Sequence, residues 1–163
     1  MENKIQFSGN TGTFFIHNPK VQSSLYLPVA NEEGIKSSVT QNFGGDCKRD
    51  QNTFLLEPVS VENLHNNRST RNIWCKINQT ENYSLTGVSA QAEYEKFIGV
   101  EDEVTLQAGF MWQTVNRISR QHSITSSISI FAPLGYPVEI MHIEIGNQSK
   151  ETMTTQIVAA IPI

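Results

Sequence analysis

The sequence predicts an all-β protein, an antiparallel sandwich or barrel, and three observations carry that prediction. Runs in which apolar and polar residues alternate fill the last third of the chain, at 104–119, 122–133 and 138–163. Successive side chains of a strand point to opposite faces, so a period of two indicates strands with one buried face. Short turn signals separate the runs, and only the stretch 60–70 has a weak helical start. We therefore expect eight to eleven strands in one domain spanning 1–163.

The first half of the chain divides into short extended segments. They are expected at 11–17, 23–30, 35–40, 52–60 and 71–78. Proline cannot donate to a sheet ladder, so Pro28 places the second segment at a sheet edge or a bulge. The turn at 31–34 predicts a hairpin, and Gly44 and Gly45 allow positive φ in the loop 41–52.

The second half is expected to hold the main sheet. A strand is predicted at 83–90, and 91–103 is interpreted as an exposed connector or a strand. The run 104–119 is predicted to be one strand whose apolar face continues to Trp112. The turn at 146–151 is expected to reverse the chain, so that 155–161 runs back along 138–145 as a hairpin.

Composition narrows the classes of function. The net charge is −4 and no basic cluster stands out, which argues against a nucleic-acid partner. No run reaches the length of a membrane span, and the first residues lack the apolar centre of a signal peptide, so we expect a cytoplasmic protein without a membrane partner. Cys47 and Cys75 are then expected to be reduced thiols, and their separation matches no zinc motif.

A catalytic centre is not predicted. The four histidines are dispersed, and the chain has neither a nucleophile elbow nor a phosphate-cradling glycine loop. Two carboxylates at a defined separation suffice for glycoside cleavage, but sequence alone does not define a separation. We therefore assign no catalytic residue, no metal ligand and no cofactor.

One segment, 44–72, concentrates polar side chains in irregular structure. Loops carry function more often than strands do, so this segment holds the candidate substrate-binding or interface residues. The candidates are Asp46, His65, Asn66, Arg68 and Arg71, with Trp74 just beyond the segment. Arg68 and Arg71 are three apart and could project together toward a carboxylate, a phosphate or sugar hydroxyls. The alternative is a surface ion-pair network with Asp46, Asp50 and Glu62.

The two tryptophans offer a second type of site. An exposed tryptophan can stack on a sugar ring, whereas a buried one fills a core. The pattern indicates a core position for Trp112 and leaves Trp74 unplaced.

Two stretches, LYLPVANEEGIKSSVTQNFGGD (25–46) and FLLEPVSVENLHNNRSTRNIWC (54–75), resemble the N-terminal region of glycoside hydrolase family 94 phosphorylases, formerly glycosyltransferase family 36. The similarity is closest to the β-1,2-oligoglucan and cellobiose phosphorylase-like members. The run 138–163 is similar to paired strands of the same region, so the resemblance covers most of the chain from about residue 12.

The resemblance implies a supersandwich related to galactose mutarotase-like domains. It also implies a homodimer, and a parent enzyme that cleaves β-glucan oligosaccharides with inversion, using inorganic phosphate as a substrate. The family's catalytic groups lie in an (α/α)6 barrel that this chain does not contain, so none is transferred to any residue here.

Two functional interpretations follow. The first is a non-catalytic N-terminal part of such a phosphorylase, with a structural role in contacts with the barrel and within a dimer. The second is an autonomous carbohydrate-binding module with an exposed platform such as Trp74 or Tyr83. The last strand stops within an extended run, so we expect an incomplete sandwich whose open edge self-associates or pairs with another segment.

Overall fold

The computed structural model describes residues 5–19, 25–58 and 70–163, and these form an all-β antiparallel fold. Within these ranges lie twelve strands and one helix. The expected fold class is confirmed, although the strands outnumber the expected eight to eleven. The helical start predicted within 60–70 lies almost wholly outside the described residues.

The largest element is a six-stranded antiparallel sheet in the order β1-β2-β8-β9-β10-β11. Its strands are β1 (Gln6–Ser8), β2 (Thr13–His17), β8 (Glu103–Gly109), β9 (Trp112–Ser119), β10 (Ile124–Phe131) and β11 (Ile140–Asn147). Every neighbouring pair is antiparallel. The chain thus brings strands from both ends of the sequence into one layer.

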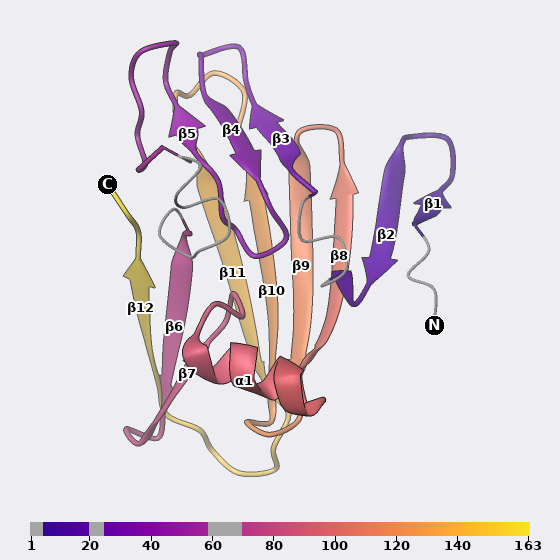
Figure 1. Cartoon of the computed structure of the whole chain (residues 1–163), viewed down its shortest axis with the longest axis vertical. Coiled ribbons are helices and arrows are strands. Elements are labelled where there is room, and N and C mark those ends of the chain that lie inside the picture. The colour runs from indigo at the N-terminus through magenta and orange to yellow at the C-terminus, as the bar shows by residue number, and fades with distance from the viewer. Residues whose placement is uncertain (1–4, 20–24, 59–69) are drawn as a thin grey trace.

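Two three-stranded sheets form the other layer, in the orders β12-β6-β7 and β3-β4-β5. Their strands are β3 (Leu27–Ala30), β4 (Lys36–Val39), β5 (Cys47–Lys48), β6 (Asn72–Ile77), β7 (Glu81–Ser84) and β12 (Thr155–Ala160). In Figure 1 the β3-β4-β5 sheet lies in front of the upper part of the six-stranded sheet, and β6 and β12 lie to the left of β11. β3 lies at an edge, as the proline at position 28 predicted.

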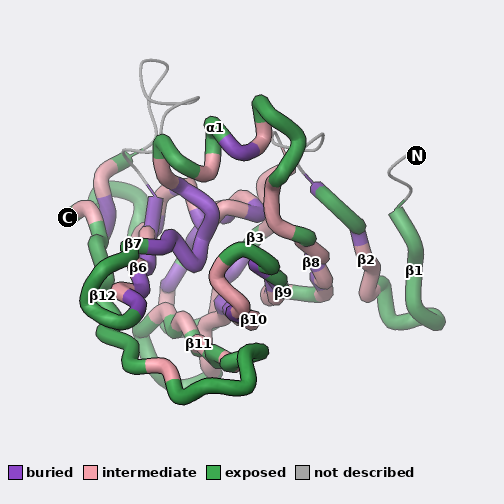
Figure 2. The backbone as a smooth tube through the Cα atoms, turned by 90° about the horizontal axis from the view of Figure 1, so that it is seen from below, coloured by how far each residue is buried: buried purple, intermediate pink, exposed green. Residues whose placement is uncertain are grey.

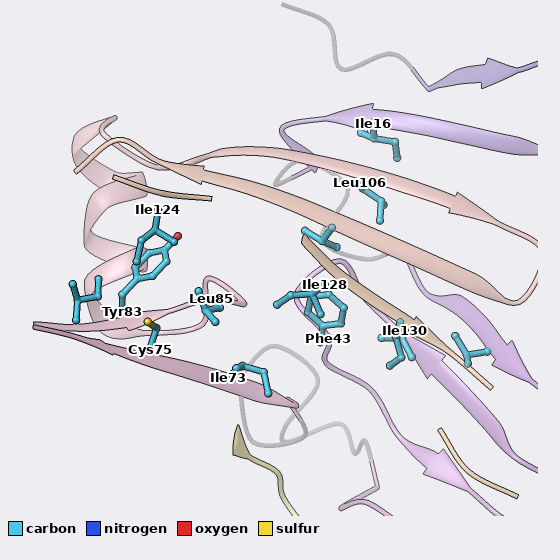
Figure 3. Packing of buried hydrophobic residues seen from close by; sticks show 14 residues of the cluster. Ile16, Phe43, Ile73, Cys75, Tyr83, Leu85, Leu106, Ile124, Ile128 and Ile130 are labelled. Atoms are coloured by element: carbon cyan, nitrogen blue, oxygen red, sulfur yellow. The ribbon is translucent and has the colours of Figure 1, made fainter. Parts of the chain in front are cut away.

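The core lies between the layers and draws on all three sheets. Figure 3 shows Leu106 and Ile128 of the large sheet and Ile73 and Cys75 of the small one in the same cluster as Phe43. Each of these side chains is at most 3 % exposed. Burial of an aliphatic side chain of this size stabilises a fold by about 1.5–3 kcal/mol, so the shared cluster ties the layers together.

The run 104–119 is two strands, and the single-strand prediction was wrong. β8 and β9 form a hairpin that turns at Phe110 and Met111, where Met111 has φ 63°. The turn shifts the alternation, so Val115 points into the core and Trp112 lies on the outer face. There the Trp112 ring lies over Gly109, where a Cβ would come within 2.6 Å of it.

The predicted hairpin of 138–145 with 155–161 was also wrong. β11 pairs with β10, whereas β12 pairs with β6, so the connection crosses from one layer to the other. Ile157 lies opposite Cys75, and Ala159 lies opposite Ile73. A turn signal shows that a chain reverses but not which strand it then joins.

A helix, α1 (Ala90–Ile98), replaces the strand or connector expected in this region, and β7 ends earlier than the strand predicted at 83–90. The Ser89 hydroxyl caps the helix by accepting a hydrogen bond from the Ala92 N–H, and Gly99 ends it with φ 75°. Glu95 is the only buried residue of the helix, so no apolar stripe marks the helix in the sequence. Its sequence signals are the two caps.

Candidate functional site

The structure separates the candidate residues of the polar segment into two places. His65, Asn66 and Arg68 lie outside the described residues. Asp46 and Arg71 come together at one end of the core, where Arg71 donates to the Asp46 carbonyl oxygen over 3.4 Å. Trp74 lies on β6, on the face turned away from the core.

Arg71 is the centre of a buried polar cluster and is only 1 % exposed. Its Nε donates to Glu139 Oε1 over 2.6 Å and its Nη2 to Glu139 Oε2 over 3.0 Å, a bidentate pair. Its Nη1 donates to the carbonyl oxygens of Phe43, over 3.2 Å, and Gly45, over 3.1 Å. The guanidinium is therefore surrounded by acceptors of this chain.

This cluster fixes the glycine loop against the segment that leads into β11. Glu139 also accepts a hydrogen bond from the Ser37 hydroxyl, so one carboxylate joins β4 to Arg71. Gly45 has φ 119°, and a Cβ there would lie 1.8 Å from the Ser38 carbonyl oxygen. The loop needs glycine because the backbones approach so closely. Arg71 therefore stabilises the fold. Its partner is Glu139, which is not one of the acids expected from the sequence.

The outer face of the small sheet carries a different arrangement around Trp74. Alternation along β6 puts Trp74 and Lys76 on this face, with Val158 and Gln156 of β12 opposite them. A hollow of about 250 Å³ is lined by Lys76, Gln79, Thr154 and Gln156, and Trp74 is not among its lining residues. Ammonium, amide and hydroxyl groups around a hollow, on a sheet face that also carries a half-buried indole, are a combination that can contact a sugar.

Tyr83 is buried, which corrects its interpretation as an exposed platform. It is 7 % exposed, and its hydroxyl donates to Asp102 Oδ2 over 2.7 Å. Arg117 contacts the same carboxylate oxygen over 3.3 Å and the Thr86 carbonyl oxygen over 3.2 Å. Burial raises the pKa of Tyr83 above its usual range, and the negative charge of Asp102 raises it further. Sequence gave no signal for this network, whose members come from separate strands and loops.

The surface of α1 is the most apolar feature that the sequence did not predict. Phe97 is 89 % exposed, Val100 59 % and Tyr94 56 %. Figure 2 shows the helix largely exposed on the outside of the molecule. We call Tyr94, Phe97, Ile98 and Val100 the helix patch. Single exposed apolar residues are ordinary, but a contiguous group indicates a contact surface.

The described residues show neither a metal-ligand cluster nor a membrane-spanning helix. In 5–19, 25–58 and 70–163, no group of three or more potential ligands is placed to hold a metal ion. No helix in these ranges has the length and apolar character that a membrane crossing requires.

Comparison with known proteins leaves the family resemblance as a prediction. No protein-family model matches the chain, and a search of the curated proteins finds no match. The fold and the surfaces described above define an antiparallel β-sandwich with an exposed apolar patch at its helix.

Proposed function

We propose that this chain is a non-catalytic β-sandwich of an inverting β-glucan phosphorylase, and that it packs against a catalytic (α/α)6 barrel. The observation that carries the proposal is the helix patch. The resemblance of 25–46 and 54–75 to family 94 phosphorylases supplies the kind of partner. The role is architectural, in cytoplasmic carbohydrate metabolism, with phosphate and the oligosaccharide bound by the barrel.

The helix patch is arranged as an interface and not as part of the core. A helix that only covers a sandwich turns its apolar side inward. α1 does the opposite, because Glu95 is buried and accepts from Gln91 over 2.9 Å while Phe97 faces solvent. Aromatic side chains such as Phe97 and Tyr94 are enriched in the centres of protein interfaces. The helices of a barrel offer the apolar grooves that such side chains fill.

A second group of exposed apolar side chains lies on a loop that hydrogen bonds hold in place. The loop between β10 and β11 exposes Leu134 by 78 % and Tyr136 by 66 %. The Asn31 side chain donates to the carbonyl oxygens of Pro133 and Tyr136, each over 2.7 Å, and Glu32 accepts from the Gly135 N–H over 2.8 Å. A loop fixed by hydrogen bonds loses little entropy when a partner covers it.

The test is reconstitution with a separately produced (α/α)6 barrel of a β-1,2-oligoglucan phosphorylase. We expect the chain to bind the barrel in calorimetry, and Phe97→Ser to weaken binding at least tenfold. Phe7→Ser is the matched control, because Phe7 is also an exposed phenylalanine, at 70 %, but lies on β1. Absence of binding, or equal effects of the two substitutions, would contradict the proposal.

The hollow at Lys76 and Gln156, on the sheet face that also carries Trp74, supports a second candidate, an autonomous carbohydrate-binding module. The test is titration with β-1,2-, β-1,3- and β-1,4-linked glucan oligosaccharides while tryptophan fluorescence is recorded. Binding of one linkage that Trp74→Ala abolishes and Trp112→Phe leaves intact would favour this candidate. Absence of heat and of a fluorescence change would leave the architectural role as the better account.

A further inference from the structure

The edge strand β12 is the least protected edge of the molecule. All six of its residues are exposed, including Ile157 at 44 % and Val158 at 50 %. Within the described residues β12 pairs with β6 alone, so its other side presents unpaired backbone donors and acceptors. An edge of this kind is a template for another strand.

The other edges carry the features that natural proteins use to block pairing. β3 contains Pro28, β7 begins with Glu81, and β11 contains Glu144. β1 has three residues and β5 has two. β12, with the sequence TQIVAA, has no charge and no proline over six residues. It therefore lacks the charge, the proline and the short length that protect the other edges.

The inner side of β12 is also incompletely covered. Ile157 and Ala159 share the side of Cys75 and Ile73, which face the core. Yet both residues of β12 are exposed, because the facing sheet ends at β11. On β11, Met141 and Ile143 pack only partly against the core, and Ile145 is 36 % exposed. An apolar strip thus continues from the core to this side of the molecule.

We propose that β12 pairs antiparallel with β12 of a second copy of this chain, about a two-fold axis centred on Ile157 or Val158. The two three-stranded sheets would then join into one sheet of six strands. Two-fold pairing places the edge against itself, and an uncharged strand meets no like charge in that arrangement. A self-pairing β11 edge would instead bring Glu144 of both copies together. β12 is thus compatible with pairing to itself, and a second copy is the occupant that we propose for this edge.

This inference rests on the proposed function in one respect, because the same family resemblance implies a homodimer, and it gives that dimer a defined surface. Its test uses the chain alone. A failure here therefore leaves the barrel experiment unaffected. Sedimentation velocity over a concentration series should show a reversible dimer. Val158→Lys should raise the dissociation constant at least tenfold, because two lysines would meet near the axis. Phe7→Lys, on an edge strand at the opposite side of the molecule (Figure 1), should leave it unchanged.

Cysteine substitution tests the register directly. A two-fold axis makes only the central residue face its own copy, so Ile157→Cys or Val158→Cys should form an intermolecular disulfide under mild oxidation. Gln156→Cys and Ala160→Cys should not, and the native Cys47 and Cys75 are buried. A monomer at every concentration, a dimer insensitive to Val158→Lys, or equal cross-linking at all four positions would overturn the inference.

Discussion

Arg71 shows how a residue that looks like a ligand in sequence can be structural. Its guanidinium is buried against Glu139, and taking two charges out of water is tolerated only when both are fully paired. A lysine could supply the charge but not the fork that contacts both carboxylate oxygens and three carbonyl oxygens.

We therefore expect Arg71→Met to lower the free energy of unfolding by about 3–5 kcal/mol, since it leaves Glu139 buried without its partner. Arg71→Lys should also destabilise, though less. Urea unfolding followed by circular dichroism measures both. In the double variant Arg71→Met with Glu139→Gln the loss should be smaller than in Arg71→Met. A loss of less than about 0.5 kcal/mol for Arg71→Met, as is usual at exposed positions, would contradict the buried ion pair.

The candidate site was predictable only in its local part. Within 44–72 the structure brings Arg71 to the backbone carbonyl of Asp46, and a role of this segment in binding a substrate or partner stays a prediction. The pairing of Arg71 with Glu139 depends on where β11 lies in the fold. A single sequence contains no signal that two residues so far apart in the chain approach each other. The same holds for Tyr83 and Asp102, whose contact requires β7 to lie near the start of β8.

Tyr83 predicts how stability changes with pH. Its pKa is raised in the folded state, by burial first and by Asp102 second. The folded protein therefore keeps the proton that the unfolded chain loses near pH 10, so the stabilisation is complete below that pH and is lost as pH rises above it. The free energy of unfolding should fall by about 1.4 kcal/mol per pH unit from this group alone.

The measurement is urea unfolding at several pH values from 8 to 11. Tyr83→Phe should be less stable at pH 8, because Asp102 loses a donor, and should show a shallower decline at high pH. Tyr136→Phe, which removes an exposed phenol, should follow the wild type. Parallel curves for Tyr83→Phe and the wild type would show that the phenol does not control this decline.

At the scale of elements, α1 illustrates what patterning misses. Periodicity detects helices that bury an apolar stripe, and this helix buries Glu95 instead. Its caps were present in the sequence as Ser89 and Gly99, nine helical residues apart. The prediction of a single strand at 104–119 was wrong for a related reason. The apolar residues Phe110 and Met111 form the turn there, whereas such turns usually contain glycine or asparagine.

If the caps define α1, their removal should act locally. Ser89→Ala should cost about 1 kcal/mol, because the Ala92 N–H loses its acceptor. Gly99→Ala should cost about 1–2 kcal/mol, because φ 75° is unfavourable for a residue with a Cβ. Hydrogen exchange of the helix amides should quicken in both variants. Ala90→Ser, an exposed change next to the cap, is the control, and equal exchange in all three would contradict the capping account.

At the scale of the whole molecule, the fold class followed from the sequence and the topology did not. Alternation predicts strands wherever one face is buried, so an all-β fold was expected. The choice of partner for each strand depends on which apolar faces meet. β12 is the clearest case, because it joins β6 rather than β11, with Ile157 opposite Cys75 and Ala159 opposite Ile73.

The single core predicts that both layers unfold together. Trp74 lies on the small sheet and Trp112 on the large one, and they are the only tryptophans of the chain. Trp74→Phe and Trp112→Phe therefore give two proteins, each with one probe in a different layer. Because Ile73, Leu106 and Ile128 share one cluster, the midpoint seen by fluorescence should coincide in each variant with that seen by circular dichroism. Separate midpoints for the layers would mean that the cluster does not couple them. Coincident midpoints would mean that a substitution in the core, such as Ile128→Ala, lowers the stability of every strand by the same 2–5 kcal/mol, roughly the cost of such a cavity.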